Sequence, residues 1–481
     1  MKKVIRQKKF FSVLTVAVSF LIISSAFTFV EGNGGLKADF YWQPTEPTDL
    51  QLVHFYDNSS GGTIVWIWDF GDDNFSCNRN PVHMYGDDGI YIVRLTVWDD
   101  NSTMDTITYP INILNVPPVA DAGSNRIVNN LTVTFNASSS YDPDGAIVGC
   151  AWDFGDGNTA SGIFKSHTYM GDNVYTVTLN VTDNDGAYNE TSVQIIVDTE
   201  NPQTNITLDG DLGKNGWYKG NASATLDATD NLSGVNATWY KIEEEWNIYN
   251  ESFNVSAEGE NEVEYYSTDE AGNSEDIKSI TVKIDNNHPQ TNSSINGSLG
   301  NNGWYVGTVT ITLNASDALS GVDYTKYKID DGDWENYGGG VSIGSNGNHT
   351  LYFYSVDNAG NVEAEKNFTF KIDKTGPSVS ITAPKDGYLY IFGREILPTV
   401  LGKTKIIGSF TAAATATDTL SGIQAIYFKL DGQVLWEDFN SPYKAELPRE
   451  FPFGVHTLTV TAYDGAGNSV TTGEVKYIKI L

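Results

Sequence analysis

Two short acidic stretches have the residue types that could hold a metal ion. Asp153-Phe154-Gly155 is the triplet that holds magnesium in protein kinases, and it recurs as Asp69-Phe70-Gly71. A kinase would also need a glycine-rich loop, a Val-Ala-Ile-Lys strand and a His-Arg-Asp loop, and the sequence contains none of these. We therefore expect a structural role, in which Trp152 and Phe154 point from one strand into a core while Asp153 points outward.

The histidines give no support for catalysis. His83 and His167 occupy equivalent positions in two His-x-Tyr segments, and His349 and His456 do so in two His-Thr-Leu segments. Such repetition marks structural positions. The sequence has no Ser-His-Asp or Cys-His pattern with a nucleophile signature and no Cys/His metal spacing, and its repeats leave no room for a glycosidase domain. We expect a protein that is not an enzyme and has no catalytic residues.

Calcium binding is the more specific hypothesis, because Ca²⁺ prefers several carboxylate and carbonyl oxygens. Asp-x-Leu-Ser-Gly and Asp-x-Ala-Gly-Asn segments recur in loops that meet at one end of an immunoglobulin-type sandwich. The candidate ligands in these loops are Asp230, Asp269, Asp317, Asp357, Asp418 and Asp464. The linker residues Asp198, Asp285 and Asp373 would join them if the units stack end to end. A further candidate cluster contains Asp142, Asp144, Asp183 and Asp185.

A simpler interpretation of these aspartates stays open. Each Asp or Asn could cap its own tight turn by accepting hydrogen bonds from backbone N–H groups. Two alternatives also exist for the tryptophans of the Asn-Gly-Trp-Tyr segments. Trp217 and Trp304 could bind a glycan by stacking, or they could pack in a core or between units. Trp246 and Trp334 are the next candidates for sugar stacking.

Internal repeats organise the chain of 481 residues. Trp-Asp-Phe-Gly-Asp at Trp68 recurs 84 residues later at Trp152. A second repeat, of about 87 residues, carries Asn-Gly-Trp-Tyr at Asn215 and again at Asn302, and a third, diverged copy has its Asp-x-Leu-Ser-Gly-Ile segment at Asp418. Proline-bearing linkers separate the copies. Turn signals every 8–12 residues and alternating strands such as 174–182 and 308–317 predict β-sandwiches.

The predicted fold class is all-β, with five tandem sandwiches after an N-terminal signal segment. The predicted boundaries are 1–30 for a signal peptide or N-terminal anchor, then 36–115, 116–198, 199–286, 287–374 and 375–481. Cys150 lies two residues before Trp152 on the same strand face, so we expect it in a core and do not expect a disulfide with Cys77.

The net charge and the N-terminal segment indicate the partners and the location of the protein. The net charge is −32 and the pI is about 4.3. Such an acidic surface repels phosphate backbones, so we expect no nucleic-acid partner. A basic segment precedes an apolar run, which predicts a secretory signal peptide, with an uncleaved membrane anchor as the alternative. Frequent Asn-x-Ser/Thr sequons, such as the one at Asn136, fit a glycosylated protein in the extracellular space or at the cell surface.

The first two units resemble polycystic kidney disease (PKD) domains. The motifs that carry this resemblance are SSSYDPDGAIVGCAWDFGDGNTASG, HTY and YTVTLNVTDNDG in the second unit. The first unit departs from the pattern, because Asn58 and Ser60 replace Asp142 and Asp144. The third and fourth units resemble Ig-like extracellular repeats of bacterial and archaeal surface proteins, and the fifth is similar to a related Ig-like module.

This resemblance implies spacer, adhesion or carbohydrate-associated modules. We expect a non-enzymatic, modular cell-surface structural or adhesion protein with extracellular protein or carbohydrate partners. The alternative is a secreted, polysaccharide-binding accessory protein of extracellular hydrolases. Calcium is the only cofactor that the sequence suggests, and no other cofactor is expected.

Overall fold

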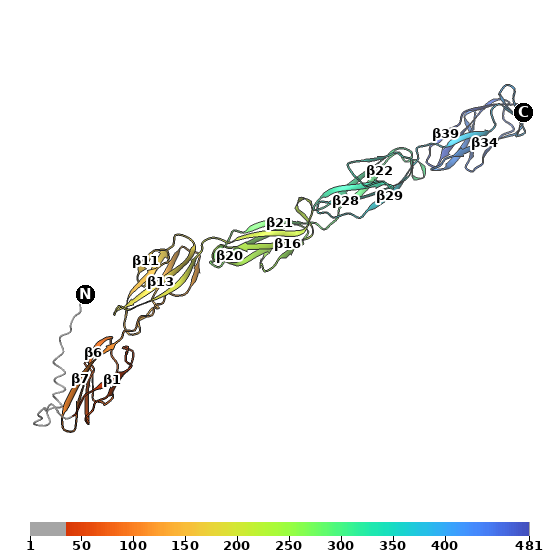
Figure 1. Ribbon diagram of the computed structural model, residues 1–481. Helices are drawn as coiled ribbons and strands as arrows, with labels where there is room; N and C mark the ends of the chain where they lie inside the picture. The colour runs from red at the N-terminus through yellow and green to blue at the C-terminus, as the bar shows by residue number, and fades with distance from the viewer. Residues whose placement is uncertain (1–34, 481) are drawn as a thin grey trace. The chain divides into compact units, whose positions relative to one another are not determined.

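The computed structural model describes residues 35–480, so the predicted signal segment at 1–30 lies outside the described residues. Within this range nearly every element is a β-strand, as the arrows in Figure 1 show, and the two helical elements are 3₁₀ turns of three residues each. No helix in residues 35–480 is both long and apolar enough to cross a membrane. The all-β class predicted from the repeats is confirmed.

The chain divides into two compact units. Among the described residues, the first contains 35–203, 228–237 and 267–276, and the second contains the remainder. The described residues form five clusters of buried hydrophobic side chains, each within one repeat. We call these repeats the first to fifth sandwich, in chain order.

The first sandwich packs two sheets against each other around Trp68, Phe55 and Tyr85. One sheet has the order β1-β2-β5 and the other β4-β3-β6-β7. The strands are β1 (Phe40–Gln43), β2 (Val53–Asp57), β3 (Val65–Asp69), β4 (Phe75–Ser76), β5 (Val82–His83), β6 (Gly89–Trp98) and β7 (Met104–Ile113).

The second sandwich repeats this core with Trp152, Phe135 and Tyr169. Its sheets have the orders β12-β9 and β11-β10-β13-β14-β8. The strands are β8 (Arg126–Val128), β9 (Thr132–Asn136), β10 (Ile147–Asp153), β11 (Thr159–Ser161), β12 (Phe164–Thr168), β13 (Asn173–Asp183) and β14 (Tyr188–Val197). Val177, Leu179 and Val181 alternate into the core from β13 as the sequence pattern predicts.

The third sandwich has one continuous sheet in the order β15-β16-β21-β20-β17-β18, and β19 also pairs with β16. Val263, Val282 and Ile284 are central to its core. Its elements are β15 (Gln203–Leu212), η1 (Lys214–Gly216), β16 (Trp217–Thr229), β17 (Val235–Ile242), β18 (Glu245–Ile248), β19 (Phe253–Val255), β20 (Gly259–Asp269) and β21 (Lys278–Ile284).

The fourth sandwich has sheets in the orders β22-β24-β27 and β23-β29-β28-β25-β26. Val309, Ile311 and Leu313 alternate into its core from β24. Its elements are β22 (Gln290–Asn296), η2 (Asn301–Gly303), β23 (Trp304–Tyr305), β24 (Val309–Ser316), β25 (Val322–Ile329), β26 (Glu335–Asn336), β27 (Val341–Ile343), β28 (Gly347–Asp357) and β29 (Lys366–Ile372).

The fifth sandwich has a longer front segment, which forms two more strands than the equivalent segment of the fourth sandwich. Its sheets have the orders β30-β34-β37 and β32-β31-β33-β40-β38-β35-β36, with β39 also paired to β38. The strands are β30 (Ser378–Ala383), β31 (Tyr388–Ile391), β32 (Arg394–Pro398), β33 (Thr404–Ile407), β34 (Phe410–Thr417), β35 (Ile423–Leu430), β36 (Gln433–Asp438), β37 (Tyr443–Leu447), β38 (Gly454–Asp464), β39 (Ser469–Thr471) and β40 (Val475–Lys479).

Candidate calcium sites

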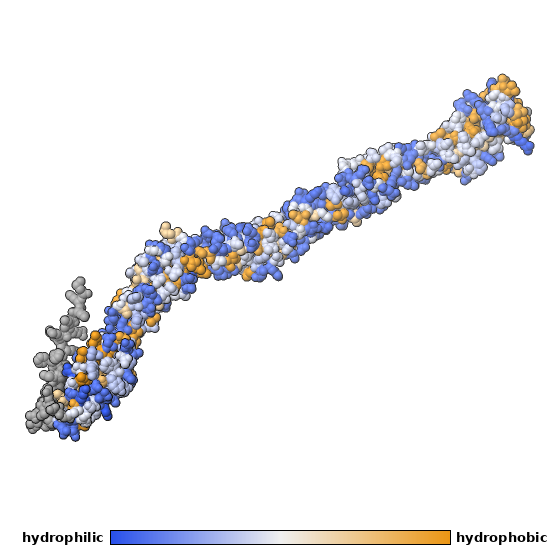
Figure 2. Space-filling model, viewed as in Figure 1, coloured by the Kyte–Doolittle hydropathy of each residue, from blue (hydrophilic) through white to orange (hydrophobic). Residues whose placement is uncertain are grey.

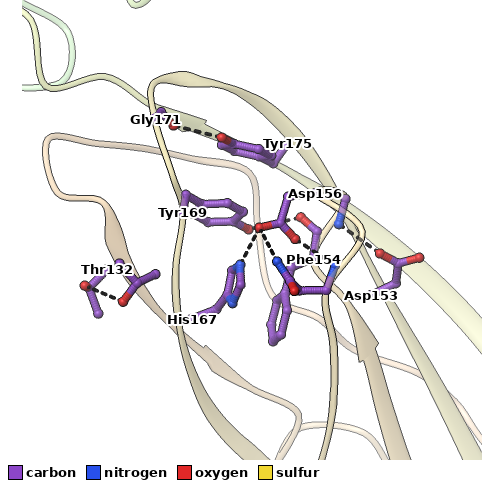
Figure 3. A network of polar contacts seen from close by, with 11 residues as sticks. Thr132, Asp153, Phe154, Asp156, His167, Tyr169, Gly171 and Tyr175 are labelled. Atoms are coloured by element: carbon purple, nitrogen blue, oxygen red, sulfur yellow. Dashed lines mark hydrogen bonds and ion pairs between the residues drawn. The ribbon is translucent and has the colours of Figure 1, made fainter.

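The Asp-Phe-Gly segment of the second sandwich is a structural turn. Trp152 and Phe154 are buried, while Asp153 is exposed and accepts a hydrogen bond from the Gly155 backbone N–H at 2.9 Å. The Asp156 carboxylate lies 2.7 Å from the His167 imidazole, which stacks on the Phe154 ring at a centroid distance of 4.1 Å. Figure 3 shows His167 pointing at Asp156 beside this ring. The predicted inward and outward directions are therefore correct.

The first sandwich repeats this arrangement. Asp69 accepts from the Gly71 N–H at 3.0 Å, Asp72 lies 2.8 Å from His83, and His83 stacks on Phe70 at 4.2 Å. Each of these aspartates therefore already forms a hydrogen bond with a turn N–H group or with a histidine ring. The equivalence of the two histidines holds in three dimensions as well as in sequence.

Nine aspartates form three equivalent groups, which we call the trios. Within each trio, one carboxylate oxygen from each residue lies within 4.8 Å of the other two. The trios are Asp198, Asp230 and Asp269; Asp285, Asp317 and Asp357; and Asp373, Asp418 and Asp464. Each combines one linker residue with two loop residues, so the structure brings the loop candidates together and adds the linker aspartate to each pair.

The loop before β17, and the equivalent loops before β25 and β35, position the middle aspartate of each trio. Asp230 Oδ1 accepts from the backbone N–H groups of Leu232 at 3.0 Å and Gly234 at 2.7 Å. Asp317 and Asp418 cap the equivalent turns in the same way. Burial raises the pKa of Asp230, but these N–H donors outweigh it, so the net pKa lies below the usual value. The turn-capping interpretation is therefore correct for one oxygen of each side chain.

The Asp-x-Ala-Gly-Asn loop ties the third aspartate to the linker. Asp269 accepts from the backbone and side chain of Asn273, and the Asn273 amide also donates to the Asp198 carbonyl at 2.9 Å. Asn361 and Asn468 make the same bridges in the next two sandwiches. The side-chain amide of the asparagine thus holds the linker to the loop. Because this amide is uncharged, it does not neutralise the negative charge of the carboxylates.

The trios concentrate negative charge in buried surroundings. Six of their members are buried, namely Asp198, Asp269, Asp285, Asp357, Asp373 and Asp464. None of the nine takes part in an ion pair within residues 35–480. Asp373 is fully buried, and its Oδ2 has no hydrogen-bond partner. A buried, unpaired carboxylate oxygen facing two other acids is an arrangement that a cation would stabilise.

The four candidate ligands of the second sandwich do not form one group, because Asp185 lies apart from Asp142, Asp144 and Asp183. Burial and the neighbouring Asp144 and Asp183 raise the pKa of Asp142. Asp183 Oδ2 accepts from the Asn115 amide at 2.7 Å, and Asp144 Oδ2 accepts from the Val116 N–H at 2.6 Å. Both oxygens of Asp142 and the Oδ1 of Asp144 are buried without a partner.

Asp185 does not complete this cluster as the sequence suggested. Its carboxylate oxygen lies instead within 4.8 Å of those of Asp87 and Asp88 from the first sandwich. The repeat pattern of the sequence did not indicate Asp87 and Asp88, nor Asp49 of the same sandwich. The adjacent acids at 87 and 88 were a visible signal, whereas nothing in the local sequence around Asp49 distinguishes it.

The two glycan candidates are largely covered. The side chains of Trp217 and Trp304 are each 8% exposed, and Lys283 and Lys371 lie over their rings at 5.7 and 5.0 Å. Little ring face is left for a sugar, which favours the packing alternative. Trp246 and Trp334 are partly exposed and each contacts a tyrosine ring edge-on. Cys77 and Cys150 are both free, as expected.

Comparison with known proteins identifies some of these modules. Residues 43–113 and 115–197 match the PKD domain model, and residues 398–460 match the bacterial Ig domain model. Pre-pro-metalloprotease PrtV of Vibrio cholerae is 30% identical over 138 residues, which cover 29% of this chain and 15% of that protein. Collagenase ColA of Clostridium perfringens is 25% identical over 186 residues, which cover 33% of this chain and 16% of that protein.

A solved PKD1 domain of Vibrio anguillarum Epp is 37% identical and covers 18% of this chain and all of the solved chain, with a TM-score of 0.17. The chain thus spans only a small part of the curated relatives it matches. PKD and Ig-like domains are non-catalytic modules. The chain therefore carries two PKD domains, at residues 43–113 and 115–197, and a bacterial Ig domain at residues 398–460.

Proposed function

We propose that the chain is a non-enzymatic extracellular structural and adhesion element whose Ig-like sandwiches are fixed to their preceding linkers by bound Ca²⁺. The observation that carries this proposal is the threefold repetition of the trios, each with its linker aspartate and with Asp373 Oδ2 unpartnered. Asp142, Asp144 and Asp183 offer similar chemistry in the second sandwich. Extracellular modules bind Ca²⁺ with dissociation constants of about 0.1 to 1 mM, which suits this location.

The physical reason is the cost of mutual repulsion. Three carboxylates within 4.8 Å, mostly buried, repel one another when ionised, and a hard divalent cation relieves this repulsion. Binding to the folded state alone would then stabilise it. With a dissociation constant of about 0.1 mM, 2 mM Ca²⁺ would add about 1.8 kcal/mol per site.

Calorimetry of the full chain with the triple variant Asp230→Asn, Asp317→Asn and Asp418→Asn tests the proposal. Asparagine retains the Oδ1 that caps each turn but removes one charge from each trio. We expect 2 mM Ca²⁺ to raise the melting temperatures of the wild type and to raise them much less in the variant.

A matched control carries Asp69→Asn, Asp121→Asn and Asp153→Asn. These residues also cap turns through Oδ1 and lie outside the trios, so the charge change is the same. The control should respond to Ca²⁺ like the wild type. If Ca²⁺ leaves the wild-type melting temperatures unchanged, the proposal fails.

The fifth sandwich offers a surface for the adhesive contact. Figure 2 shows hydrophobic residues gathered on the face of this sandwich that is in view. Val400 and Leu401 are 98% and 83% exposed, and Phe453 and Val455 are 70% and 68% exposed. Exposed apolar side chains that gather on one face support a role in protein contacts. The glycan-binding alternative has less support, because Trp217 and Trp304 are buried.

A further inference from the structure

Four strand ends of the fifth sandwich meet at one end of its larger sheet, where β31, β33, β40 and β38 are neighbours. Phe392 follows β31 and donates its backbone N–H to the Ile407 carbonyl of β33 at 2.9 Å. Ile480 follows β40 and donates its N–H to the Ile406 carbonyl at 2.9 Å. Gly454, the first residue of β38, pairs with the end of β40. Residues that are far apart in the chain are therefore gathered at this end.

The side chains gathered there are large, apolar and exposed. We call the group of Phe392, Phe453, Val455 and Ile480 the tip. Their exposed fractions are 62%, 70%, 68% and 43%. Figure 2 shows hydrophobic residues at the end of the fifth sandwich where Figure 1 marks C. Side chains exposed to this extent project from the surface and leave their apolar area in water.

Phe392 adopts a backbone conformation that is unfavourable for its side chain. Its φ is 47°, which lies in the left-handed region. A glycine or an asparagine would form this turn at lower cost. The ring also lies against Gly408, where a Cβ would be 2.5 Å from the ring Cδ1. The fold therefore keeps a large apolar ring on the tip at a cost, which points to a use for the ring.

Unpaired cations flank the tip. Arg394 begins β32 two residues after Phe392. Arg449 lies in the loop before β38, and the Lys479 ammonium holds this loop by donating to the Pro448 and Arg449 carbonyls at 2.9 and 3.1 Å. Neither guanidinium forms an ion pair within residues 35–480. Both positive charges are therefore available to a partner.

The acids near the tip are mostly engaged elsewhere. Glu395 lies 3.4 Å from the Lys385 ammonium, and Asp431 lies 2.7 Å from the His456 ring. Glu450 is exposed and forms no ion pair within the described range. Two unpaired guanidinium groups against one unpaired carboxylate leave the surroundings of the tip positive.

The fifth sandwich is nearly neutral, unlike the rest of the chain. Residues 375–481 contain nine Lys and Arg and ten Asp and Glu, which give a net charge of −1. Residues 35–374 contain 15 and 50 of them, which give a net charge of −35. An anionic surface would therefore repel the first four sandwiches but not the fifth. The last Asn-x-Ser/Thr sequon is at Asn367, so a glycan on a sequon would not shield the tip.

We propose that the tip binds an anionic lipid surface, with its apolar side chains inserted at the headgroup boundary and with Arg394 and Arg449 beside the lipid phosphates. Projecting apolar side chains with cations next to them suit this boundary. The proposal rests on the adhesive role given above to the fifth sandwich, but not on Ca²⁺, and it names the surface that this sandwich contacts. The alternative partner is a second copy of the chain, but two tips would bring the same cations together.

Vesicle flotation tests the proposal with residues 31–481. This form keeps all five hydrophobic cores and omits the apolar run before residue 31, which would bind vesicles by itself. The buffer contains 100 mM NaCl and 1 mM EDTA, so that Ca²⁺ does not bridge acids and lipid phosphates. We expect about fivefold more protein to float with vesicles of phosphatidylcholine and 30% phosphatidylglycerol than with phosphatidylcholine alone.

A double variant of the tip locates the apolar contact. Phe392→Ser with Phe453→Ser should remove most of the binding to anionic vesicles. Val148→Ser with Met170→Ser replaces two similarly exposed apolar residues of the second sandwich and should leave the binding unchanged. Circular dichroism of each variant verifies the fold.

A second double variant tests the cations. Arg394→Gln with Arg449→Gln should lower binding to anionic vesicles to the level seen with neutral vesicles. Arg94→Gln with Lys219→Gln removes the same charge at exposed positions of other sandwiches and should not lower it.

Two results would overturn the lipid contact: a wild type that does not float with anionic vesicles, and a tip variant that floats as well as the wild type. If the wild type instead forms a concentration-dependent dimer in sedimentation velocity, and the tip variant does not, the tip binds a second copy. That outcome would keep the adhesive role and replace lipid with protein. The calorimetric response to Ca²⁺ is measured separately, so failure here leaves the trios untouched.

Discussion

The His456 imidazole forms a hydrogen bond with the Asp431 carboxylate, and His349 and Asp330 form the same pair at the equivalent positions of the fourth sandwich. In each pair the imidazole Nδ1 lies within 2.8 Å of a carboxylate oxygen, and the residue after the histidine donates its backbone N–H to the other oxygen. The His456 Nε2 also faces the Pro452 carbonyl at 2.9 Å. Two acceptors around one ring favour the imidazolium, in which both nitrogens donate.

The charge of His456 should therefore depend on Asp431. Burial and Lys479 lower the pKa of His456, but Asp431 and the Pro452 carbonyl outweigh them, so the net pKa is above its ordinary value. The pair's stabilisation is therefore complete below the ordinary histidine pKa and is lost as pH rises through the raised value. Asp431→Asn should lower the pKa of His456 and should cost about 1 kcal/mol of unfolding free energy at pH 6.

Nuclear magnetic resonance titration of the imidazole protons measures this pKa directly. Hydrogen exchange of the β38 amides, corrected for the intrinsic rate at each pH, reports the accompanying stability. An Asp431→Asn chain in which His456 titrates as in the wild type would contradict the role of the carboxylate.

At the scale of elements, the turn between β10 and β11 shows why the Asp-Phe-Gly-Asp-Gly pattern recurs. Gly155 has a φ of 78°, and a Cβ there would lie 2.4 Å from the Thr176 carbonyl oxygen on the neighbouring strand β13. Gly157 has a φ of 88° but no atom within 4 Å of such a Cβ. Gly155 is needed for two reasons: its backbone is in the left-handed conformation, and the Thr176 carbonyl leaves no room for a Cβ. Gly157 is needed for its left-handed conformation alone.

The two glycines therefore make a matched pair of variants. Gly157→Ala should lower the unfolding free energy of the second sandwich by about 1 kcal/mol, which is the cost of a left-handed alanine. Gly155→Ala should cost roughly 3 kcal/mol or more, because the β13 backbone must also move. Calorimetric unfolding of the full chain compares them. Equal losses would show that the contact with Thr176 does not matter.

Much of this element-level structure could be predicted from sequence, because it depends on local patterns. The alternation of β13 and β24 and the caps at Asp230 follow from residues within a few positions of one another. The positions of Asp49 and Asp185 do not. They depend on the bridge between Thr48 and Leu114 and on the approach of two sandwiches, which join residues far apart in the chain.

The burial of Trp217 is another feature that the sequence left undecided. The Asn-Gly-Trp-Tyr segment is compatible with an exposed or a covered indole. The outcome depends on β21, which runs parallel to the start of β16 and places Lys283 beside the ring. A repeat therefore identifies equivalent positions, but it does not say which neighbouring strand covers them.

At the scale of the whole molecule, the three trios couple the linkers to the sandwiches that follow them. Asp198, Asp285 and Asp373 belong to the linkers, and the other members of each trio belong to loops of the next sandwich. If Ca²⁺ joins the members of a trio, removing the cation should loosen the corresponding linker. Each trio has its own residues, so each linker should respond separately.

Limited proteolysis of the full chain can measure the response of each linker to Ca²⁺ separately. In 2 mM Ca²⁺ we expect slow cleavage by proteinase K at 197–204, 284–291 and 372–379, and in EDTA we expect cleavage at least several-fold faster at all three. Asp317→Asn should make only 284–291 sensitive in the presence of Ca²⁺, because Asp317 shares its trio with Asp285 alone among the linker residues. Mass spectrometry of the fragments assigns each cut. Cleavage that is equally fast with and without Ca²⁺ in the wild type, or a variant that opens all three linkers together, would show that the trios do not hold the linkers individually.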